Sequence, residues 1–143
     1  MDESALIRLA LQAREHSYSP YSGFAVGAAL LCPDGKVFTG CNIESSSFSP
    51  TNCAERTAFF KAVSEGNRKF CSIAVIGAKW DSILPFPSCT PCGVCLQVMN
   101  EFCSGDFRVI LAQSPEQYTV KQLKELLPCG FALDKEGDNR END

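Results

Sequence analysis

The stretch "SIAVIGAKW" at residues 72–80 decides the fold class more than any other part of the sequence. It is a nearly continuous apolar run with the length of one strand, which is typical of a strand buried on both faces. Strand and helix patterns alternate on either side of it, and this alternation indicates a layered α/β domain. We expect one domain over residues 1–131 and a polar, disordered tail over residues 132–143.

The residues before this strand predict a helix, a β-hairpin and a second helix. An acidic first turn and apolar side chains at helical spacing indicate the first helix. The tight Asp34–Gly35 turn between two apolar segments is a strong hairpin signal. Gly66 follows the second helix at a position where glycine often ends helices. These four elements are expected at residues 4–16, 24–31, 37–44 and 53–65.

The residues after it predict a helix, a strand and a short final helix. A proline-rich loop leads to a helix expected over residues 92–103, and a strand is expected over residues 107–113. Thr119 and Gln122 stand in capping-box positions, which predicts a short helix over residues 119–127. The hairpin implies antiparallel pairing, whereas the later order of strand, helix and strand implies parallel pairing.

The composition is that of a globular protein with a small ligand. A chain of 143 residues, 45% hydrophobic and 21% charged, can bury a core without disulfides. The formal net charge of −4 provides no broad basic surface, so we expect no polymeric nucleic acid as a partner. No apolar stretch has the length of a bilayer span, and the N-terminal residues do not resemble a signal peptide. We therefore expect a cytoplasmic protein without a membrane partner.

Nine cysteines need an explanation other than disulfides, because the cytosol keeps thiols reduced. Five stand singly, mostly among apolar neighbours, and are expected to be small core or strand residues. These are Cys32, Cys41, Cys71, Cys103 and Cys129. The others stand at the starts of two predicted helices, where free N–H groups and the helix dipole favour a thiolate. They are Cys53, Cys89, Cys92 and Cys95.

Three of these thiols have the pattern of a metal site. Cys53, Cys92 and Cys95 could hold a tetrahedral zinc ion and leave its fourth position open to water, as catalytic zinc sites do. Glu55 follows Cys53 by two residues and is placed to exchange protons with that water. Arg56 lies three residues after Cys53, where it could donate a hydrogen bond to sulfur and offset the charge of the thiolates.

The residues alone leave two other kinds of site open. Cys89, Cys92 and Cys95 form a C-x2-C-x2-C run that could hold an iron–sulfur cluster, although the fourth cysteine and the following proline of a ferredoxin run are missing. A zinc-stabilised binding module without catalytic activity is the second alternative. Structural zinc sites are usually closed by four ligands, however, and have no use for Glu55.

Two motifs carry a specific resemblance to a known family. "CAER" at residues 53–56 and "PCGVC" at residues 91–95 match the Cys-x-Glu and Pro-Cys-x-x-Cys signature of zinc deaminases in its three-cysteine form. The likeness continues through "PYSGFAVGAALL", "GCNIE", "CGVCLQVMNEF" and "ELLP", to about residue 131. The sequence resembles the small homotetrameric cytidine deaminases of the cytidine/deoxycytidylate deaminase superfamily. The resemblance implies a three-layer α/β/α fold with a mixed central sheet of about five strands.

The chemistry follows from the same resemblance. It implies one zinc ion per subunit, held by Cys53, Cys92 and Cys95, and a proton-shuttling role for Glu55. The implied reaction is the hydrolytic deamination of cytidine and 2′-deoxycytidine to uridine and 2′-deoxyuridine in pyrimidine salvage. Deamination of a related nucleoside such as blasticidin S is the alternative within the same chemistry.

The resemblance also implies a substrate pocket that is shared between subunits. Asn42 and Glu44 match the pair that hydrogen-bonds the ribose 3′-hydroxyl, and Phe24 matches an aromatic residue of the pyrimidine pocket. Ala54 belongs to the same substrate-binding set. Phe131 matches an aromatic residue that reaches the active site of a neighbouring subunit, so a homotetramer is implied. From local sequence alone, either aromatic could fill the core, the asparagine could form a turn and the glutamate could be a solvated loop acid.

Two positions depart from the family pattern. Family members commonly have arginine directly after the last cysteine of the second motif, where this chain has Leu96. Leucine cannot donate to a thiolate, so more of the charge compensation is expected from Arg56 and from backbone amides. Cys89 adds a competing thiol three residues before Cys92, and the resemblance selects Cys92 and Cys95 as the ligands.

Overall fold

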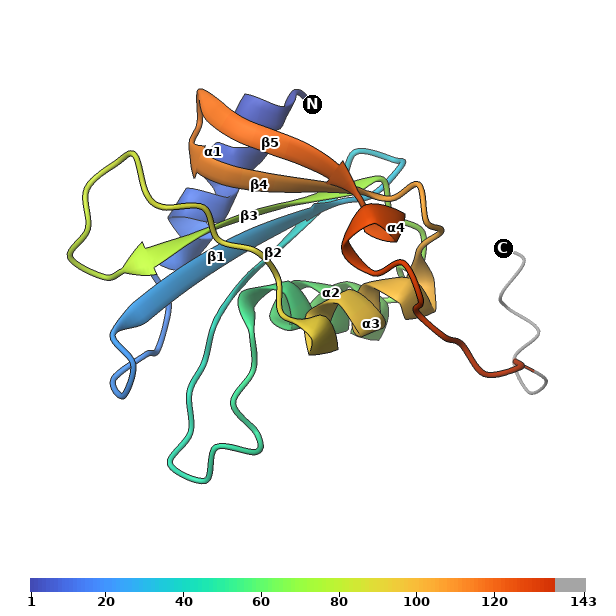
Figure 1. Cartoon of the computed structure of the whole chain (residues 1–143), viewed down its shortest axis with the longest axis horizontal. Coiled ribbons are helices and arrows are strands. Elements are labelled where there is room, and N and C mark those ends of the chain that lie inside the picture. Colours follow the sequence, from blue (N-terminus) through green and yellow to red (C-terminus); the bar gives the residue numbers. More distant parts are fainter. Residues whose placement is uncertain (136–143) are drawn as a thin grey trace.

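The computed structural model describes residues 1–135 and contains one mixed sheet of five strands. Figure 1 shows this sheet with its helices. In chain order the strands are β1 (Phe24–Leu31), β2 (Val37–Cys41), β3 (Ser72–Lys79), β4 (Arg108–Ser114) and β5 (Gln117–Gln122). Their order in the sheet is β2-β1-β3-β4-β5. The β3 and β4 strands pair in parallel, and the other neighbouring strands pair antiparallel.

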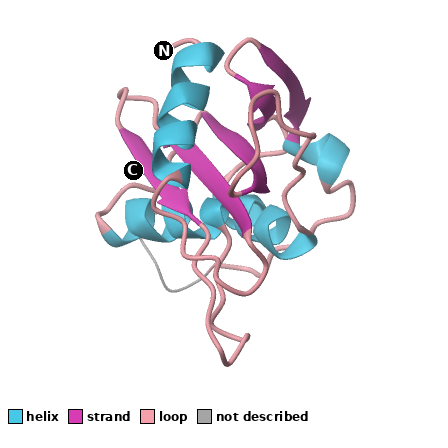
Figure 2. Ribbon diagram, turned by 90° about the vertical axis from the view of Figure 1, so that its left-hand side faces the viewer, coloured by secondary structure: helices cyan, strands magenta, loops and turns pink. Residues whose placement is uncertain are grey.

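Helices cover both faces of this sheet (Figure 2). The α1 helix (Glu3–Arg14) packs on one face, mainly against β1 and β3. The α2 helix (Ala54–Ser64) packs on the opposite face against β2 and β1, and it contacts α3 (Gly93–Phe102). The short α4 helix (Leu123–Leu126) follows β5 and contacts α3. The predicted three-layer α/β/α fold with a mixed five-stranded sheet is therefore confirmed.

The alternation of buried side chains along β3 explains the layers. Ile73 and Val75 belong to the core between the sheet and α2. Ala74 and Ile76 belong to the core between the sheet and α1, because successive strand residues face opposite sides. Every β3 residue except Lys79 is buried. This confirms the interpretation of the apolar run as a strand covered on both faces.

Two glycines allow helices to approach the sheet closely. A Cβ atom at Gly27 would lie 1.9 Å from the backbone oxygen of Ala10 in α1. A Cβ atom at Gly40 would lie 2.4 Å from the backbone oxygen of Ala54, the first residue of α2. Real Cβ atoms essentially never come within 3.0 Å of another heavy atom. Because Gly40 has no side chain, the start of α2 can lie against β2. Cys53, which directly precedes α2, lies close to the sheet for the same reason.

The C-terminal part differs from the sequence prediction. The helix predicted over residues 119–127 is wrong in its first half, because residues 119–122 form the end of β5 and only α4 is helical. The capping box consists of Gln122 with Glu125, instead of Thr119 with Gln122. Antiparallel pairing with β4 in a tight hairpin stabilises the strand, and the capping pattern of residues 119–122 does not reveal this pairing.

All nine cysteines lie within the described residues and are free. Cys32 is buried and Cys41 lies in β2, as the sequence predicts, and Cys103 is partly buried against the core. Cys71 and Cys129 are exposed and lie outside the strands, so the prediction is wrong for these two. Apolar neighbours in the sequence are therefore not sufficient evidence that a residue is buried.

The α2 helix ends at a glycine, and no regular element follows α4 within residues 1–135. Gly66 directly follows Glu65, the C-cap residue of α2, and has a φ angle of +93°. This confirms the prediction that a glycine ends the helix. Within residues 1–135, no helix has both the length and the apolar character needed to span a membrane. Residues 132–135 have no regular secondary structure, and the rest of the predicted tail, residues 136–143, lies outside the described part.

Candidate active site

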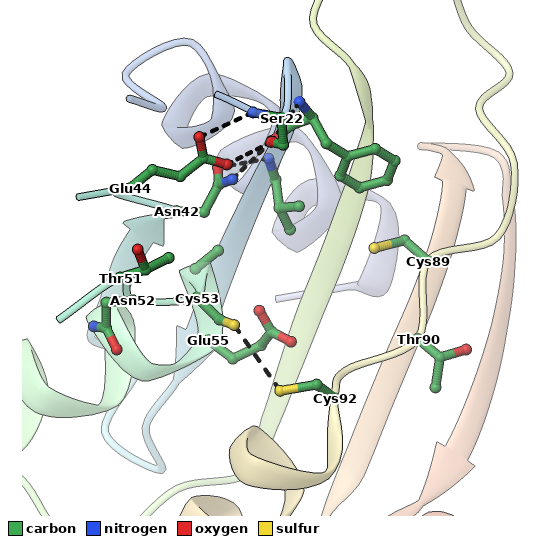
Figure 3. A pocket seen from close by; sticks show the side chains of 13 residues that line it. Ser22, Asn42, Glu44, Thr51, Asn52, Cys53, Glu55, Cys89, Thr90 and Cys92 are labelled. Atoms are coloured by element: carbon green, nitrogen blue, oxygen red, sulfur yellow. Dashed lines mark hydrogen bonds between the residues drawn. The ribbon is translucent and has the colours of Figure 1, made fainter. Parts of the chain in front are cut away.

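Three cysteine sulfur atoms meet where α2 and α3 begin. Cys53 is the residue before α2, Cys92 is the residue before α3, and Cys95 is buried in the first turn of α3. Their Sγ atoms all lie within 4.8 Å of one another, and those of Cys53 and Cys92 are 4.0 Å apart (Figure 3). Tetrahedral ligands about 2.3 Å from zinc lie roughly 3.8 Å from one another. The three sulfur atoms therefore fit a zinc ion.

The local structure leaves these sulfur atoms free for a metal. Neither Cys53 nor Cys92 uses its side chain to cap its own helix. Both stand at helix N-termini, where the helix dipole favours a negative charge on sulfur. A hydrogen bond from the Cys95 thiol lowers the pKa of Cys53 and correspondingly raises the pKa of Cys95.

Arg56 supplies a positive charge behind the sulfur atoms. Its Nη2 donates a hydrogen bond to Cys53 Sγ at 3.3 Å. Burial lowers the pKa of Arg56, whereas hydrogen bonds to Cys53 and Cys95 raise it, and the net pKa lies above the ordinary value. Leu96 is buried in the core between the sheet and α2 and contributes no charge. Arg56 is therefore placed to offset the charge of the thiolates.

Glu55 is almost fully buried, with 4% of its surface exposed. It lines the same cavity as Cys53 and Cys92 (Figure 3). Burial raises the pKa of Glu55 to about 7, and the charge on Cys53 acts in the same direction. A carboxyl group in this environment can both take up and release a proton near neutral pH.

A cavity of about 280 Å³ extends from the sulfur cluster toward the loops that flank β1 and β2. This volume is close to the lower end of the range of about 300–1,000 Å³ that is typical of small-molecule sites. Glu55 and Cys92 lie at one end, and Asn42 and Glu44 lie at the other (Figure 3). Of the residues that the sequence predicts at the site, the cavity is lined by Phe24, Asn42, Glu44, Cys53, Ala54, Glu55 and Cys92.

Asn42 ties the end of β2 to the start of β1. Its Oδ1 accepts hydrogen bonds from the Val26 N–H, at 2.9 Å, and from the Ser17 hydroxyl. Its Nδ2 donates to the backbone oxygen of Phe24 at 2.7 Å. A carboxamide has two N–H donors, so the contacts among the described residues leave one of them for a ligand. Asn42 therefore supports the strand that carries Phe24 and also lines the cavity.

Glu44 is held by the loop that precedes β1. Its Oε1 accepts hydrogen bonds from the backbone N–H groups of Tyr21, at 3.0 Å, and Ser22, at 3.2 Å. Its Oε2 accepts a hydrogen bond from the Ser22 hydroxyl. The Ser22 hydroxyl and these N–H groups lower the pKa of Glu44, so the group is ionised at neutral pH. Glu44 is thus a positioned anion and not a freely solvated loop acid.

Sequence reasoning missed part of the cavity lining. Ser22, Thr51, Asn52 and Thr90 also line it. None of them has a local pattern that distinguishes it from an ordinary turn or loop residue. Cys89 lines the cavity but lies outside the sulfur cluster, and burial raises the pKa of its thiol to about 11. The structure therefore leaves Cys89 out of the group of candidate ligands.

Phe131 does not line the cavity of its own chain. Its side chain is 66% exposed. Its backbone oxygen accepts hydrogen bonds from Gln97 Nε2 and, at 3.1 Å, from Asn100 Nδ2, both on α3. These bonds anchor the backbone and leave the ring exposed. The role of Phe131 in a neighbouring subunit stays a prediction.

Comparisons with known proteins identify the family. Residues 1–112 match the family model for the cytidine and deoxycytidylate deaminase zinc-binding region. A cytidine deaminase from Halalkalibacterium halodurans is 49% identical over 138 residues, which cover 96% of this chain and 100% of that protein. The structure is similar to that of a cytidine deaminase from Burkholderia pseudomallei, with a TM-score of 0.81 and 45% identity, over 92% of this chain and 100% of the other. The corresponding values for the Mycobacterium tuberculosis cytidine deaminase are 0.75 and 36%, over 93% and 99% of the two chains. This chain therefore belongs to the cytidine and deoxycytidylate deaminase family.

Proposed function

We infer that this protein is a zinc-dependent enzyme that converts cytidine and 2′-deoxycytidine, with water, to uridine and 2′-deoxyuridine and ammonia. Family membership and near-full-length similarity to proteins named cytidine deaminase support this activity. The observation that carries the proposal is a cluster of three sulfur atoms within 4.8 Å of one another, two of whose residues, Cys53 and Cys92, line a cavity together with the buried carboxyl group of Glu55. A purely structural zinc site has no use for either the cavity or the carboxyl group.

The residues at the end of the cavity next to the sulfur cluster have different roles in the reaction. Cys53, Cys92 and Cys95 would hold the zinc ion, which supplies Lewis acidity that makes water a nucleophile near neutral pH. Glu55 transfers the two protons of the attacking water to the substrate, one to N3 of the ring and one to the amino group, which leaves as ammonia when the C4–N bond breaks. Because the carboxyl group of Glu55 is buried, the proton is passed within the cavity and exchange with bulk water is limited.

The opposite end of the cavity suits an uncharged sugar. The ionised carboxylate of Glu44 can accept a hydrogen bond from a sugar hydroxyl, but it would repel a phosphate group. Asn42 has one N–H available to donate to the same sugar. Phe24 and Ala54 provide apolar surface for the pyrimidine ring. These features favour a free nucleoside over deoxycytidylate and over polymeric nucleic acid, in agreement with the net charge of −4.

We also propose that the active unit is a homotetramer that works in the cytoplasm in pyrimidine salvage. The ring of Phe131 is 66% exposed, which suits a role in the active site of a neighbouring subunit. All nine cysteines are free, which suits a reducing compartment. Residues 1–131 then form the single catalytic domain.

The variant Glu55→Gln tests the proposed activity, because glutamine keeps the size of the side chain and cannot shuttle protons. We expect turnover of cytidine to fall by about 10²–10⁴-fold. Zinc content should stay at that of the wild type, and calorimetry should still detect nucleoside binding. The matched control is Glu65→Gln, which removes an exposed carboxylate at the other end of α2 and should leave turnover unchanged. Full turnover in Glu55→Gln would rule out the assigned role.

A further inference from the structure

A set of hydrogen bonds joins the two loops at the Glu44 end of the cavity. The backbone N–H of Tyr18 donates to the oxygen of Asn42 at 3.0 Å, and the N–H of Glu44 donates to the oxygen of Tyr18 at 2.8 Å. The Tyr21 hydroxyl and Ser46 Oγ are also hydrogen-bonded to each other. The carboxylate of Glu44 therefore lies in a contact between two loops that are joined at several points.

Ser22 connects this carboxylate to the strand that carries Phe24. Its hydroxyl donates to Glu44 Oε2 and accepts a hydrogen bond from the Phe24 N–H at 3.0 Å (Figure 3). A hydroxyl group has a single donor hydrogen, so the direction of both bonds is fixed. Two consecutive hydrogen bonds therefore connect the Phe24 N–H, the Ser22 hydroxyl and the Glu44 carboxylate, and each of them polarises the other.

The two oxygen atoms of Glu44 differ in how they are held. Oε1 has two backbone donors, the N–H groups of Tyr21 and Ser22. Oε2 has only the Ser22 hydroxyl as a donor among the described residues. Removing the hydroxyl would therefore leave Oε2 without a protein donor and would leave the Phe24 N–H without its acceptor. Ser22 is exposed, so its replacement creates no cavity in the core.

We propose that Ser22 is a positioning residue that sets the selectivity of the cavity for a nucleoside with a free 3′-hydroxyl. It does so by fixing the Glu44 carboxylate and linking it to Phe24 at the start of β1. This inference rests on the proposed function, since it takes the sugar hydroxyl as the partner of Glu44. A substrate that lacks the 3′-hydroxyl cannot donate a hydrogen bond to the Glu44 carboxylate. Its turnover should therefore not depend on Ser22.

The test compares 2′-deoxycytidine with 2′,3′-dideoxycytidine, which differ only in the 3′-hydroxyl. Steady-state kcat and KM are measured for the zinc-loaded wild type, Ser22→Ala and Ser22→Thr. In Ser22→Ala we expect kcat/KM for 2′-deoxycytidine to fall about tenfold, mainly through KM, because a hydrogen bond to a charged group is lost. The value for 2′,3′-dideoxycytidine should change by less than about twofold. Threonine keeps the hydroxyl and should restore the value for 2′-deoxycytidine.

Two results would overturn the inference. An equal loss of kcat/KM on both substrates in Ser22→Ala would mean that Ser22 has only a structural role. Equal kcat/KM of the wild type for the two substrates would show that the enzyme does not recognise the 3′-hydroxyl. The matched control is Ser49→Ala in the neighbouring loop. Ser49 is exposed, and within the described residues its hydroxyl makes no hydrogen bond, so this variant should behave as the wild type.

A second measurement separates this inference from the proposed function. The pKa of Glu44, followed by carbon-13 NMR, should rise in Ser22→Ala and stay at the wild-type value in Ser22→Thr, whether or not a nucleoside is turned over. A wild type that is inactive on both nucleosides would defeat the proposed function, and a raised pKa in Ser22→Ala would still support the positioning of Glu44. An unchanged pKa in Ser22→Ala would overturn the inference.

Discussion

Arg56 and Leu96 together decide how the charge of the sulfur cluster is balanced. Arg56 Nη2 donates to Cys53 at 3.3 Å, and Arg56 Nε is buried and has no hydrogen-bond partner within the described residues. Leu96 lies in the core between the sheet and α2. Burying part of a guanidinium group costs free energy unless an anion faces it, and the thiolates of a metal site are such anions. The position of Arg56 is therefore best explained by its contact with the ligand sulfur atoms.

The variant Arg56→Ala should weaken zinc binding strongly in this chain. Loss of a hydrogen bond to a ligand typically costs about 10- to 100-fold in metal affinity or activity, and Leu96 offers no substitute. Competition with a chelator, together with turnover of cytidine on the same sample, measures both effects. Arg8→Ala is the matched control, because Arg8 is an exposed residue of α1 whose ion pair with Glu116 lies on the surface. Unchanged zinc affinity and turnover in Arg56→Ala would refute this account of the charge balance.

At the scale of the elements, the site depends on where α2 starts relative to β2. The two elements lie close together at Gly40 in β2, where a Cβ atom would lie 2.4 Å from the Ala54 oxygen and 2.6 Å from the Ala58 nitrogen. Both of these atoms belong to the backbone and cannot move aside as a flexible side chain would. Since Cys53 directly precedes α2, any shift of the helix also shifts a candidate ligand relative to Cys92.

The variant Gly40→Ala should therefore damage stability and zinc binding together. Overpacking costs about 1–3 kcal/mol, which corresponds to a loss of roughly 3–10 °C in melting temperature for a chain of this size. Thermal denaturation and chelator competition provide the two readouts. Gly93→Ala adds the same methyl group in the first turn of α3, where no heavy atom lies within 4 Å, and should keep the wild-type melting temperature. Identical behaviour of the two variants would mean that the close approach at Gly40 is not required.

The elements also show which parts of the structure could be predicted from the sequence. The β3 strand and the candidate ligands at the starts of α2 and α3 follow from an apolar run and from cysteine spacing, which are local patterns. The β5 strand does not, because its conformation depends on pairing with β4 and its local pattern resembles a capped helix. Ser22 could not be predicted either, because its contact with Glu44 joins two loops and a serine in a turn is common.

At the scale of the whole molecule, large apolar side chains remain on the surface of the isolated chain. Within the described residues, the exposed ones include Phe48, Trp80, Ile83, Phe131 and Leu133, each at least 66% exposed. Scattered exposed apolar residues are common and do not by themselves indicate an interaction surface. The proposed assembly rests on Phe131, whose exposed ring is available to the active site of another subunit.

Mixed assemblies of two variants test whether the sites are shared. Phe131→Ala should raise KM by about 5- to 150-fold, because stacking on a base contributes about 1–3 kcal/mol, and Glu55→Gln should be nearly inactive. When the two chains are co-expressed, some sites combine Glu55 of one chain with Phe131 of its neighbour. The value of kcat/KM should then exceed the average of the two variants measured separately. If Phe131 acts only within its own chain, the mixture will give that average.

The most direct test of the central claim is an absorbance assay of the purified protein with cytidine and 2′-deoxycytidine, with the zinc content determined on the same sample. We expect absorbance to fall as the 4-amino group is lost, in a protein that contains close to one zinc ion per chain. Glu55→Gln should carry the same amount of zinc and leave the absorbance nearly constant. A zinc-loaded wild-type protein that converts neither nucleoside would contradict the proposed activity.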